Sequence, residues 1–189
     1  MTSLRPPAVP LVVNDPYLSV WSMTDHLTDE MPRHWTGSRS PMSGMIRIDG
    51  NPYRFIGESP RYVDVKVPPI EQTSLDVLPT RTIYTFSADG VHLTLTFMTA
   101  ALPHDMDLMS RPVTTVEMDV VAIDGQTHDV SLYLDIQAEW VVDQQAQKVV
   151  WGRHRLAERD LLWMGSLEQQ MLQKSGDDLR IDWGYLYTT

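Results

Sequence analysis

The chain of 189 residues contains no cysteine. This absence excludes disulfide bonds, a thiolate nucleophile and a zinc site with cysteine ligands, and it leaves the redox compartment undetermined. Long hydrophobic runs are also missing, because no stretch approaches the roughly eighteen apolar residues of a membrane-spanning helix. Residues 1–13 lack the apolar segment of a secretory signal peptide. We therefore expect a soluble chain without a membrane partner, and its localisation stays unknown.

Basic residues are in the minority, since 15 lysines and arginines stand against 25 aspartates and glutamates, for a formal net charge of -10. An acidic chain repels phosphate backbones unless its basic residues gather on one face. Here they are scattered, so we expect no nucleic-acid partner. Hydrophobic residues make up 42% of the chain and charged residues 21%, which is typical of a globular domain with a core. The composition predicts one domain over residues 1–189.

Asp-Gly pairs are the clearest local signal. They occur at Asp49-Gly50, Asp89-Gly90 and Asp124-Gly125, each between runs of β-branched and aromatic residues. Glycine tolerates a positive φ and aspartate nearly so, which makes this pair a favoured turn between antiparallel strands. The sequence predicts three β-hairpins at these positions.

Apolar and polar residues alternate with a period of two in several segments, as they do in half-buried strands. These segments are residues 61–67, 80–86, 91–99, 113–121 and 128–136. At most, residues 153–163 or residues 166–174 form a short helix. Many short strands with frequent turns indicate an all-β protein with an antiparallel β-sandwich.

The last segment, "LRIDWGYLYTT" at residues 179–189, predicts a strand that runs to the end of the sequence. An apolar strand left without a neighbour is uncommon in a natural domain, because its open edge invites pairing with other chains. We therefore expect the domain to be truncated at its C-terminal strand.

The loop at residues 29–41, "DEMPRHWTGSRSP", carries Arg33, His34 and Trp35. Arginine offers a planar fork for a carboxylate, histidine exchanges a proton near neutral pH, and tryptophan offers a flat stacking face. One hypothesis makes these three residues substrate-facing. In the other, Trp35 plugs the end of the sandwich and Arg33 pairs with Asp29 or Asp25.

Two further aromatic residues, Tyr17 and Trp21, lie in "NDPYLSVWS" at residues 14–22. A strand there would place both on one face. They form either an aromatic wall for a ligand or part of the core.

Catalytic and metal-binding motifs are not recognisable in this sequence. The six histidines lack the close spacing of metal ligands, and there is no nucleophile elbow, phosphate loop or dinucleotide fingerprint. We expect no catalytic residue, no metal and no cofactor in this chain.

Four strings nevertheless form an ordered pattern over nearly the whole chain: "RPPAVPLVVNDPYLSVWS", "RHWTG", "MIRIDGNPYRFIG" and "GDDLRIDWGYLY". In these strings the chain resembles the N-terminal region of the glutaminase A family, large fungal and bacterial amidohydrolases that convert L-glutamine to L-glutamate and ammonia. The resemblance implies a non-catalytic β-sandwich followed by a catalytic domain shaped as an (α/α)6 helical toroid. That downstream domain would then be the chain's partner and glutamine the substrate of the parent enzyme, whose relatives are often secreted.

The resemblance also suggests a role for the 29–41 loop. In toroid enzymes that follow a β-sandwich, a sandwich loop can close one side of the active-site funnel, and the α-carboxylate of glutamine suits an arginine. The alternative hypothesis is a stand-alone β-sandwich module that binds carbohydrate or peptide. A broad apolar docking face with an unpaired terminal strand would favour the first hypothesis, and an isolated planar patch of Trp and Tyr the second.

Overall fold

Alternate residues of strand β8 (Val91–Thr99) are buried, and this period of two shows how the fold is made. Val91, Leu93, Leu95 and Phe97 are almost fully buried, while the residues between them face outward. A computed structural model describes residues 5–59 and 66–189, and the same alternation recurs in β4 (Met42–Ile48) and β7 (Arg81–Ala88). Each of these strands therefore contributes one face to a shared core.

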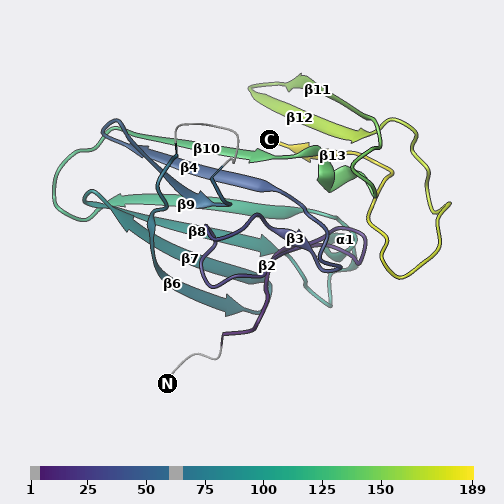
Figure 1. Cartoon of the computed structure of the whole chain (residues 1–189), viewed down its shortest axis with the longest axis horizontal. Helices are drawn as coiled ribbons and strands as arrows, with labels where there is room; N and C mark the ends of the chain where they lie inside the picture. Colours follow the sequence, from purple (N-terminus) through teal and green to yellow (C-terminus); the bar gives the residue numbers. More distant parts are fainter. Residues whose placement is uncertain (1–4, 60–65) are drawn as a thin grey trace.

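Two antiparallel sheets form the body of the molecule (Figure 1). One has the strand order β10-β4-β5, and the other has the order β6-β7-β8-β9. The remaining strands of these sheets are β5 (Asn51–Ile56), β6 (Glu71–Leu78), β9 (Thr114–Ala122) and β10 (Val130–Ile136). The rings of Phe55 and Phe86, one from each sheet, lie 6.2 Å apart in the core. This packing confirms the predicted antiparallel β-sandwich.

A small sheet at one end of the sandwich consists of β1 (Val9–Val13), β2 (Ser19–Ser22) and β3 (Arg33–His34). The Thr82 hydroxyl of β7 donates a 2.7 Å hydrogen bond to the Pro10 carbonyl, which fixes β1 against the larger sheet. The two short helices are α1 (Met106–Met109) and the 3-10 helix η1 (Ala138–Val141). Neither helix has the length or hydropathy needed to cross a membrane, and no other helix occurs in the described residues.

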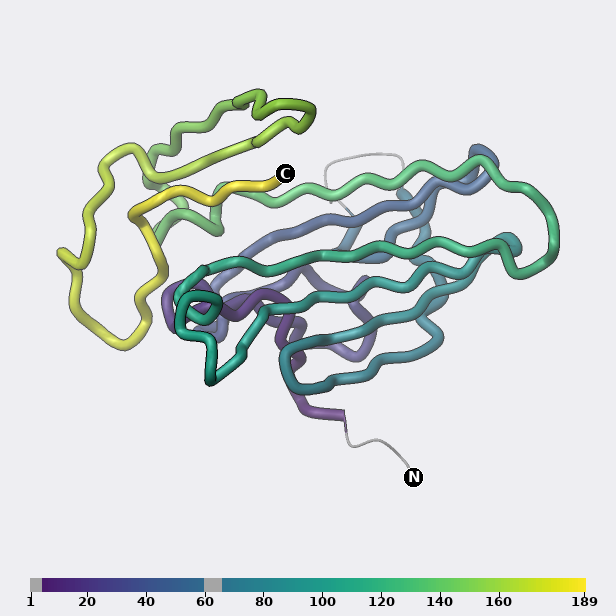
Figure 2. The backbone as a smooth tube through the Cα atoms, turned by 180° about the vertical axis from the view of Figure 1, so that it is seen from behind, coloured from purple at the N-terminus to yellow at the C-terminus, as the bar shows by residue number. Residues whose placement is uncertain are grey.

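Strands β11 (Val149–Leu156), β12 (Arg159–Ser166) and β13 (Leu186–Thr188) form a separate antiparallel sheet, which we call the ribbon. Figures 1 and 2 show the ribbon standing beside the sandwich, with the C-terminus close to it. Only its base, at Val149, Met164 and Leu186, packs against the core. The rest of the ribbon extends away from the buried region.

Two of the predicted hairpins are confirmed. Asp49-Gly50 joins β4 to β5, and Asp89-Gly90 joins β7 to β8, with positive φ at all four residues. The hairpin at Asp124-Gly125 is wrong, because β9 pairs with β8 whereas β10 pairs with β4. This turn belongs to a crossover between the sheets. The Asp124 carboxylate accepts a 2.9 Å hydrogen bond from the Gln126 N–H, which stabilises the turn locally. Such a turn forms whether or not its flanking strands pair with each other.

The predicted short helices are wrong as well. Residues 153–163 form the outer half of the β11–β12 hairpin, with its turn at residues 157–158, where Ala157 has a φ of 53°. Residues 166–174 form turns with positive φ at Gln169 and Leu172. The other predicted strands are confirmed except for two. Residues 61–65 of the 61–67 segment lie outside the described residues, and the strand predicted over 179–189 is limited to β13.

The Asp-Gly turns gather at one end of the sandwich, which we call the turn end, and His128 links two of them (Figure 1). His128 Nδ1 lies 2.6 Å from the Asp49 carboxylate, and its Nε2 lies 3.1 Å from that of Asp124. The Asp129 N–H also donates a 2.8 Å hydrogen bond to Asp49. Because Asp49 belongs to one sheet and Asp124 to the crossover, His128 fastens the crossover to the sheet.

Stability at the turn end should decrease at alkaline pH. The hydrogen bonds to Asp49 and then to Asp124 raise the pKa of His128 above 6.5, so the folded state binds this proton more tightly than the unfolded chain. The stabilisation is complete below about pH 6.5 and is lost as the pH rises through the folded pKa. Thermal unfolding between pH 6 and 9 checks this: the melting temperature of His128→Gln should change less with pH than that of the wild type.

The matched control is His104→Gln, which replaces an exposed histidine outside the cluster. It should retain the wild-type pH dependence. Equal pH dependence in His128→Gln and the wild type would contradict the role given to this ion pair.

Candidate functional site

The opposite end of the sandwich, which we call the loop end, brings together residues 14–18, 33–41 and 170–183. The first of these segments is a turn set by Asp15, whose carboxylate accepts hydrogen bonds from the N–H groups of Tyr17 (2.7 Å) and Leu18 (3.1 Å). Strand β2 consequently begins at Ser19, so Tyr17 lies in the turn and Trp21 in the strand. The argument that Tyr17 and Trp21 share a face therefore does not hold.

Tyr17 and Trp21 have different neighbours. The ring of Tyr17 packs edge-on against Trp183, with 5.1 Å between the ring centroids. The Trp21 Nε1 donates a 2.8 Å hydrogen bond to the Ser19 hydroxyl within β2. Both side chains are half-buried. Their role as substrate-facing residues stays a prediction.

The Pro16 carbonyl connects the 14–18 turn to the predicted loop. It accepts hydrogen bonds from His34 Nε2 (3.1 Å) and from Trp35 Nε1 (2.7 Å). The two donors are adjacent in the chain because β3 ends at His34, where the Ser38 carbonyl accepts the His34 N–H in a tight turn (2.8 Å). His34 and Trp35 thus position the turn that carries Tyr17.

His34 is 1% exposed, which makes it part of the interior. Since a carbonyl only accepts, Nε2 carries the proton, and Nδ1 accepts from the Thr36 hydroxyl at 2.9 Å. Burial lowers the pKa of His34 against the opposing effect of the Pro16 hydrogen bond, and the nearby Arg180 lowers it further. A proton exchange between this ring and a substrate would require the turn to open.

Trp35 and Arg33 are the accessible residues of the predicted loop. Trp35 is 50% exposed, so it does not plug the end of the sandwich, as the structural hypothesis for this loop assumed. Arg33 pairs with Glu30 at 3.2 Å, whereas the structural hypothesis for this loop named Asp29 or Asp25 as its partner. Arg33 and Glu30 line a surface hollow together with Met31, Arg39 and Glu58. In the hollow each guanidinium group lies beside a carboxylate, Arg33 beside Glu30 and Arg39 beside Glu58 at 3.7 Å.

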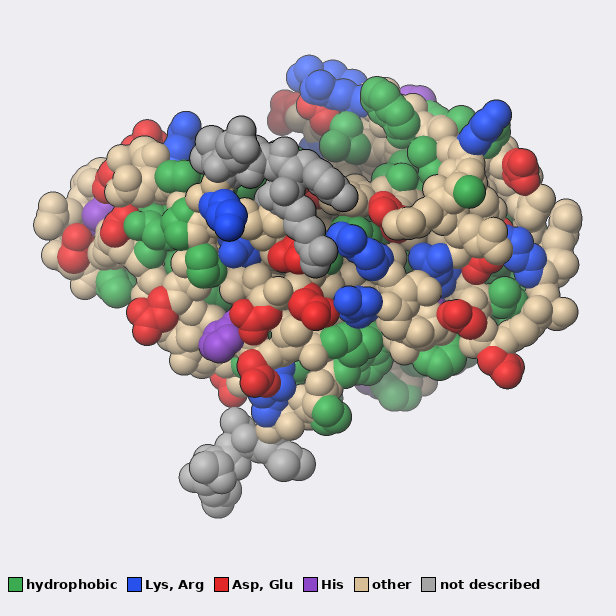
Figure 3. All heavy atoms as spheres, viewed as in Figure 1, with side chains coloured by type: hydrophobic (Ala, Val, Ile, Leu, Met, Phe, Trp, Pro, Cys, Tyr) green, Lys and Arg blue, Asp and Glu red, His purple; other side chains and the backbone are tan. Residues whose placement is uncertain are grey.

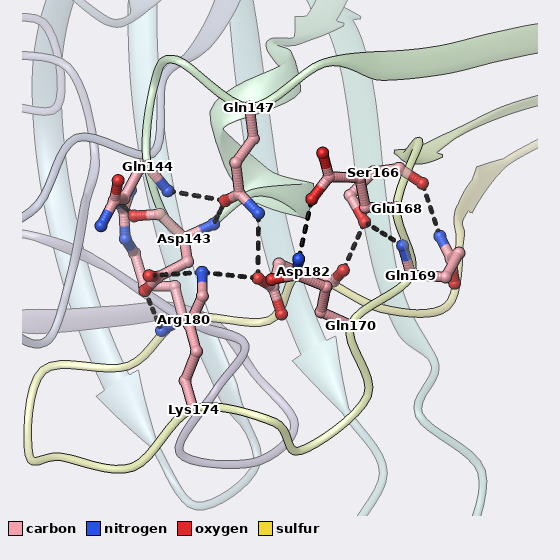
Figure 4. Close-up of polar contacts among 10 residues, drawn as sticks. All are labelled: Asp143, Gln144, Gln147, Ser166, Glu168, Gln169, Gln170, Lys174, Arg180 and Asp182. Carbon is pink, nitrogen blue, oxygen red and sulfur yellow. Dashed lines mark hydrogen bonds and ion pairs between the residues drawn. The ribbon is translucent and has the colours of Figure 1, made fainter.

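A buried ion network lies behind the loop (Figure 4). Lys174 Nζ donates to the carboxylates of Asp182 (2.7 Å) and Asp143 (2.9 Å). The side chains of these aspartates are 2% and 8% exposed, respectively. Gln147 Nε2 donates a further 3.0 Å hydrogen bond to Asp182. Burial opposes the charge of Lys174, but the hydrogen bonds to Asp182 and Asp143 outweigh it and raise the pKa of Lys174.

Arg180 joins this network to the predicted loop. Its guanidinium donates to the Asp143 carbonyl and, at 3.5 Å, to the Arg39 carbonyl, and its backbone N–H donates to the Asp143 carboxylate (3.2 Å). Next to it, the Ile181 N–H donates a 3.0 Å hydrogen bond to the Tyr17 carbonyl. The loop end is therefore one connected unit, held by residues from three distant parts of the sequence.

Sequence reasoning missed Asp143, Lys174, Arg180 and Asp182. One signal was available: Asp182 lies in the otherwise apolar run of residues 181–187, and a carboxylate in such a run requires a partner. Because the charges of the network compensate one another, we assign it to positioning the loop. In residues 5–59 and 66–189, no group of His, Asp and Glu side chains is arranged to hold a metal ion, and the expectation of a chain without metal or cofactor stays a prediction.

The structure defines the class of this protein as an antiparallel β-sandwich. A buried ion network holds its loop end together. The chain belongs to the family described as a domain of unknown function (DUF5127), whose model matches residues 80–189. A second family model, described as a domain of unknown function (DUF4964), matches residues 1–67. No solved structure matches the chain.

Curated relatives match almost the whole chain. Glutaminase A of Aspergillus oryzae is 30% identical over 191 residues, which is 97% of this chain and 27% of the relative. A probable glutaminase of Arthroderma benhamiae is 26% identical over 203 residues, covering 97% of this chain and 23% of the relative. The chain thus spans about a quarter of the length of these relatives. The resemblance to the glutaminase A family that the sequence predicted is confirmed.

Proposed function

We propose that the chain is the non-catalytic β-sandwich region of a glutaminase A-type amidohydrolase, in which it supports a helical catalytic domain and its 29–41 loop borders the active-site funnel. The observation that carries the proposal is the similarity to glutaminases over 97% of the chain, although the chain covers only 27% of the relative's length. The parent enzyme would convert L-glutamine and water to L-glutamate and ammonia. The chain supplies a rigid scaffold, and the remainder supplies the chemistry.

The residues of the loop end support this division of labour. The histidine of the predicted loop, His34, is buried, and both of its ring nitrogens are already hydrogen-bonded. The accessible groups, Arg33 and Trp35, are suited to binding: a guanidinium pairs with a carboxylate, and an indole presents a flat face to an amide. They would orient glutamine at the rim of the funnel.

The chain of residues 1–189 alone should release no ammonia from glutamine. Ser87 Oγ lies 3.1 Å from His92 Nδ1, but the two residues are cross-strand neighbours on the face of β7 and β8 that points away from the core, and a hydroxyl beside an imidazole on an open sheet face is not a catalytic centre. The protein encoded by the complete gene should release ammonia. A coupled ammonia assay on both purified proteins checks this prediction. Release by the isolated chain, abolished by a substitution within it, would refute a non-catalytic role.

Arg33→Ala should impair the parent enzyme without unfolding the sandwich. The Arg33 side chain is 37% exposed, and its ion pair with Glu30 lies at the surface, so the melting temperature of the chain should stay nearly unchanged. If Arg33 holds the α-carboxylate, kcat/KM for glutamine should fall about tenfold or more, as expected for the loss of a charged hydrogen bond. Steady-state kinetics of the parent and thermal unfolding of the chain are measured for the same variant.

The control for this experiment is Arg47→Ala, which removes another surface arginine on β4, far from the loop end. It should leave both the kinetics and the melting temperature unchanged. Unchanged kinetics in Arg33→Ala would contradict the proposal that the loop borders the active-site funnel. The proposed scaffold role of the sandwich would not be affected.

A further inference from the structure

The ribbon exposes large apolar side chains on both of its faces. On the face that turns toward the core at its base, Trp151 is 79% exposed and Leu162 is 53% exposed. These two residues share a face because Trp151 pairs with Met164, and Arg153 with Leu162, across β11 and β12. The face therefore continues the core outward, beyond the point where the sandwich can cover it.

The other face of the ribbon is aromatic. The indole of Trp163 lies nearly parallel to the ring of His154, with an interplanar angle of 13° and 5.9 Å between centroids. Tyr185 meets Trp163 edge-on at 5.4 Å, and Tyr187 is the cross-strand partner of Trp163. The two tyrosines are 46% and 54% exposed, respectively.

Two glycines allow these rings to lie against the backbone. A Cβ added to Gly152 would come within 2.8 Å of the Trp163 indole, and one added to Gly165 within 2.5 Å of the Tyr185 ring. A side chain at either position would lift the ring off the strand. The aromatic face is consequently flat, and its rings are held in place before any partner binds.

Apolar groups on both faces indicate a protein partner. A sugar-binding platform needs one aromatic face and leaves the other free to pack or to meet water, whereas here Trp151 and Leu162 are exposed opposite Tyr187. Exposed patches of this kind mark protein-protein contacts. Moreover, β13 is the last strand of the ribbon, and within the described residues its outer edge pairs with no other strand. These are the features that favour a docking function over a stand-alone binding module.

Charge narrows the choice of partner. The chain has a net charge of -10, yet the tip of the β11–β12 hairpin has a small basic excess, because Arg153, Arg155 and Arg159 stand against Glu158 and Asp160. Arg153 already pairs with Asp160. Figure 3 shows basic side chains next to hydrophobic ones at this end of the ribbon. A second copy of this chain is acidic, so the net negative charge of the molecule repels it. A partner surface with an apolar centre and an acidic rim complements the ribbon, because the apolar centre meets its apolar side chains and the rim meets its arginines.

We propose that the ribbon is the docking surface for the remaining part of a glutaminase A-type parent protein, which packs against both of its apolar faces. This inference rests on the proposed function. It is supported by the relatives, of which this chain spans 27% and 23%, and by the place of β13 in the ribbon, since residues following it in a longer protein would start beside these faces. The partner surface is apolar, with carboxylates that meet the arginines of the tip.

Hydroxyl-radical footprinting tests the proposal on two proteins, the chain of residues 1–189 and the product of the complete gene. Trp151 and Tyr187 should be oxidised about tenfold more slowly in the longer protein, because the centre of a protein interface excludes water. Tyr133 is the internal control, since it is 49% exposed on β10, and its oxidation rate should be equal in both proteins. In the longer protein, Trp151→Ser together with Leu162→Ser should restore rapid oxidation at Tyr187.

Each contrary result has its own meaning. A longer protein with glutaminase activity whose ribbon is oxidised as fast as that of the isolated chain would overturn the docking inference and leave the proposed function intact. A protected ribbon in a protein without glutaminase activity would overturn the proposed function and, with it, the glutaminase A-type parent named in the inference, and would leave only the packing of the ribbon against the rest of the longer protein. Protection that grows with the concentration of residues 1–189 would reveal self-association, and protection by added cellohexaose would reveal a glycan platform; either overturns the docking inference. A gene that ends at Thr189 overturns both.

Discussion

Replacing Lys174 by methionine should destabilise the chain by about 3 to 5 kcal/mol, the cost of removing one partner from a buried ion pair. Lys174 is the cation between Asp143 and Asp182, whose side chains are 8% and 2% exposed. Without it, two carboxylates remain close together and out of water, and the partners left to them among the described residues are the Gln147 amide and the backbone N–H of Arg180. Because the Lys174 side chain is itself 30% exposed, we expect the lower end of this range.

Urea unfolding at neutral pH measures this cost. The matched control is Lys148→Met, which makes the same substitution at an exposed lysine nearby and should change the free energy of unfolding by less than about 0.5 kcal/mol. Asp182→Asn in the Lys174→Met background should recover part of the loss, because it removes one of the opposed charges. A Lys174→Met protein as stable as the Lys148→Met control would show that the network does not stabilise the loop end.

The sandwich was predictable because its signals are local. In β7 and β8, apolar residues alternate along each strand, and Asp89-Gly90 supplies the two positive φ values of the turn between them. Asp124-Gly125 carries the same local signal, but its neighbours pair with strands far away in the sequence. Turn chemistry specifies the turn alone, and the sheet to which each flanking strand belongs is decided by core packing.

The ribbon and the ion network could not be predicted, because they too depend on pairings between distant parts of the sequence. Residues 153–163 have the spacing of a short helix, yet they form a hairpin because residues 149–152 pair across the turn at Ala157 with residues 163–166. Lys174 meets Asp143 across 31 positions of the sequence and Asp182 across 8. Single-sequence periodicity carries no information on such pairings. The predicted loop was found as a segment, while the buried state of His34 and the exposed state of Trp35 follow from tertiary contacts.

Replacing His34 by alanine should destabilise the chain by about 2 to 4 kcal/mol, since the substitution empties a buried position and removes two hydrogen bonds. The ring is 1% exposed, and it links Thr36 to the Pro16 carbonyl. Trp35→Ala removes a larger side chain from the neighbouring position, but Trp35 is 50% exposed, so we expect that variant to lose less stability. Thermal and urea unfolding of both variants of residues 1–189 test the order of the two effects. A smaller loss in His34→Ala than in Trp35→Ala would contradict the structural role of the buried ring.

The effect of His34→Ala should also depend on pH, in the opposite direction to that of His128. Burial lowers the pKa of His34 below 6.5, so the folded state binds the proton less tightly than the unfolded chain. The stability that the neutral ring provides is complete above about pH 6.5 and is lost as the pH falls through the folded pKa. The free-energy difference between wild type and His34→Ala should therefore be largest near pH 7.5 and shrink toward pH 5, because protonation of the buried ring weakens the wild type alone. Urea unfolding at these two pH values measures the difference, and a difference that stays constant would mean that His34 does not titrate as a buried neutral imidazole.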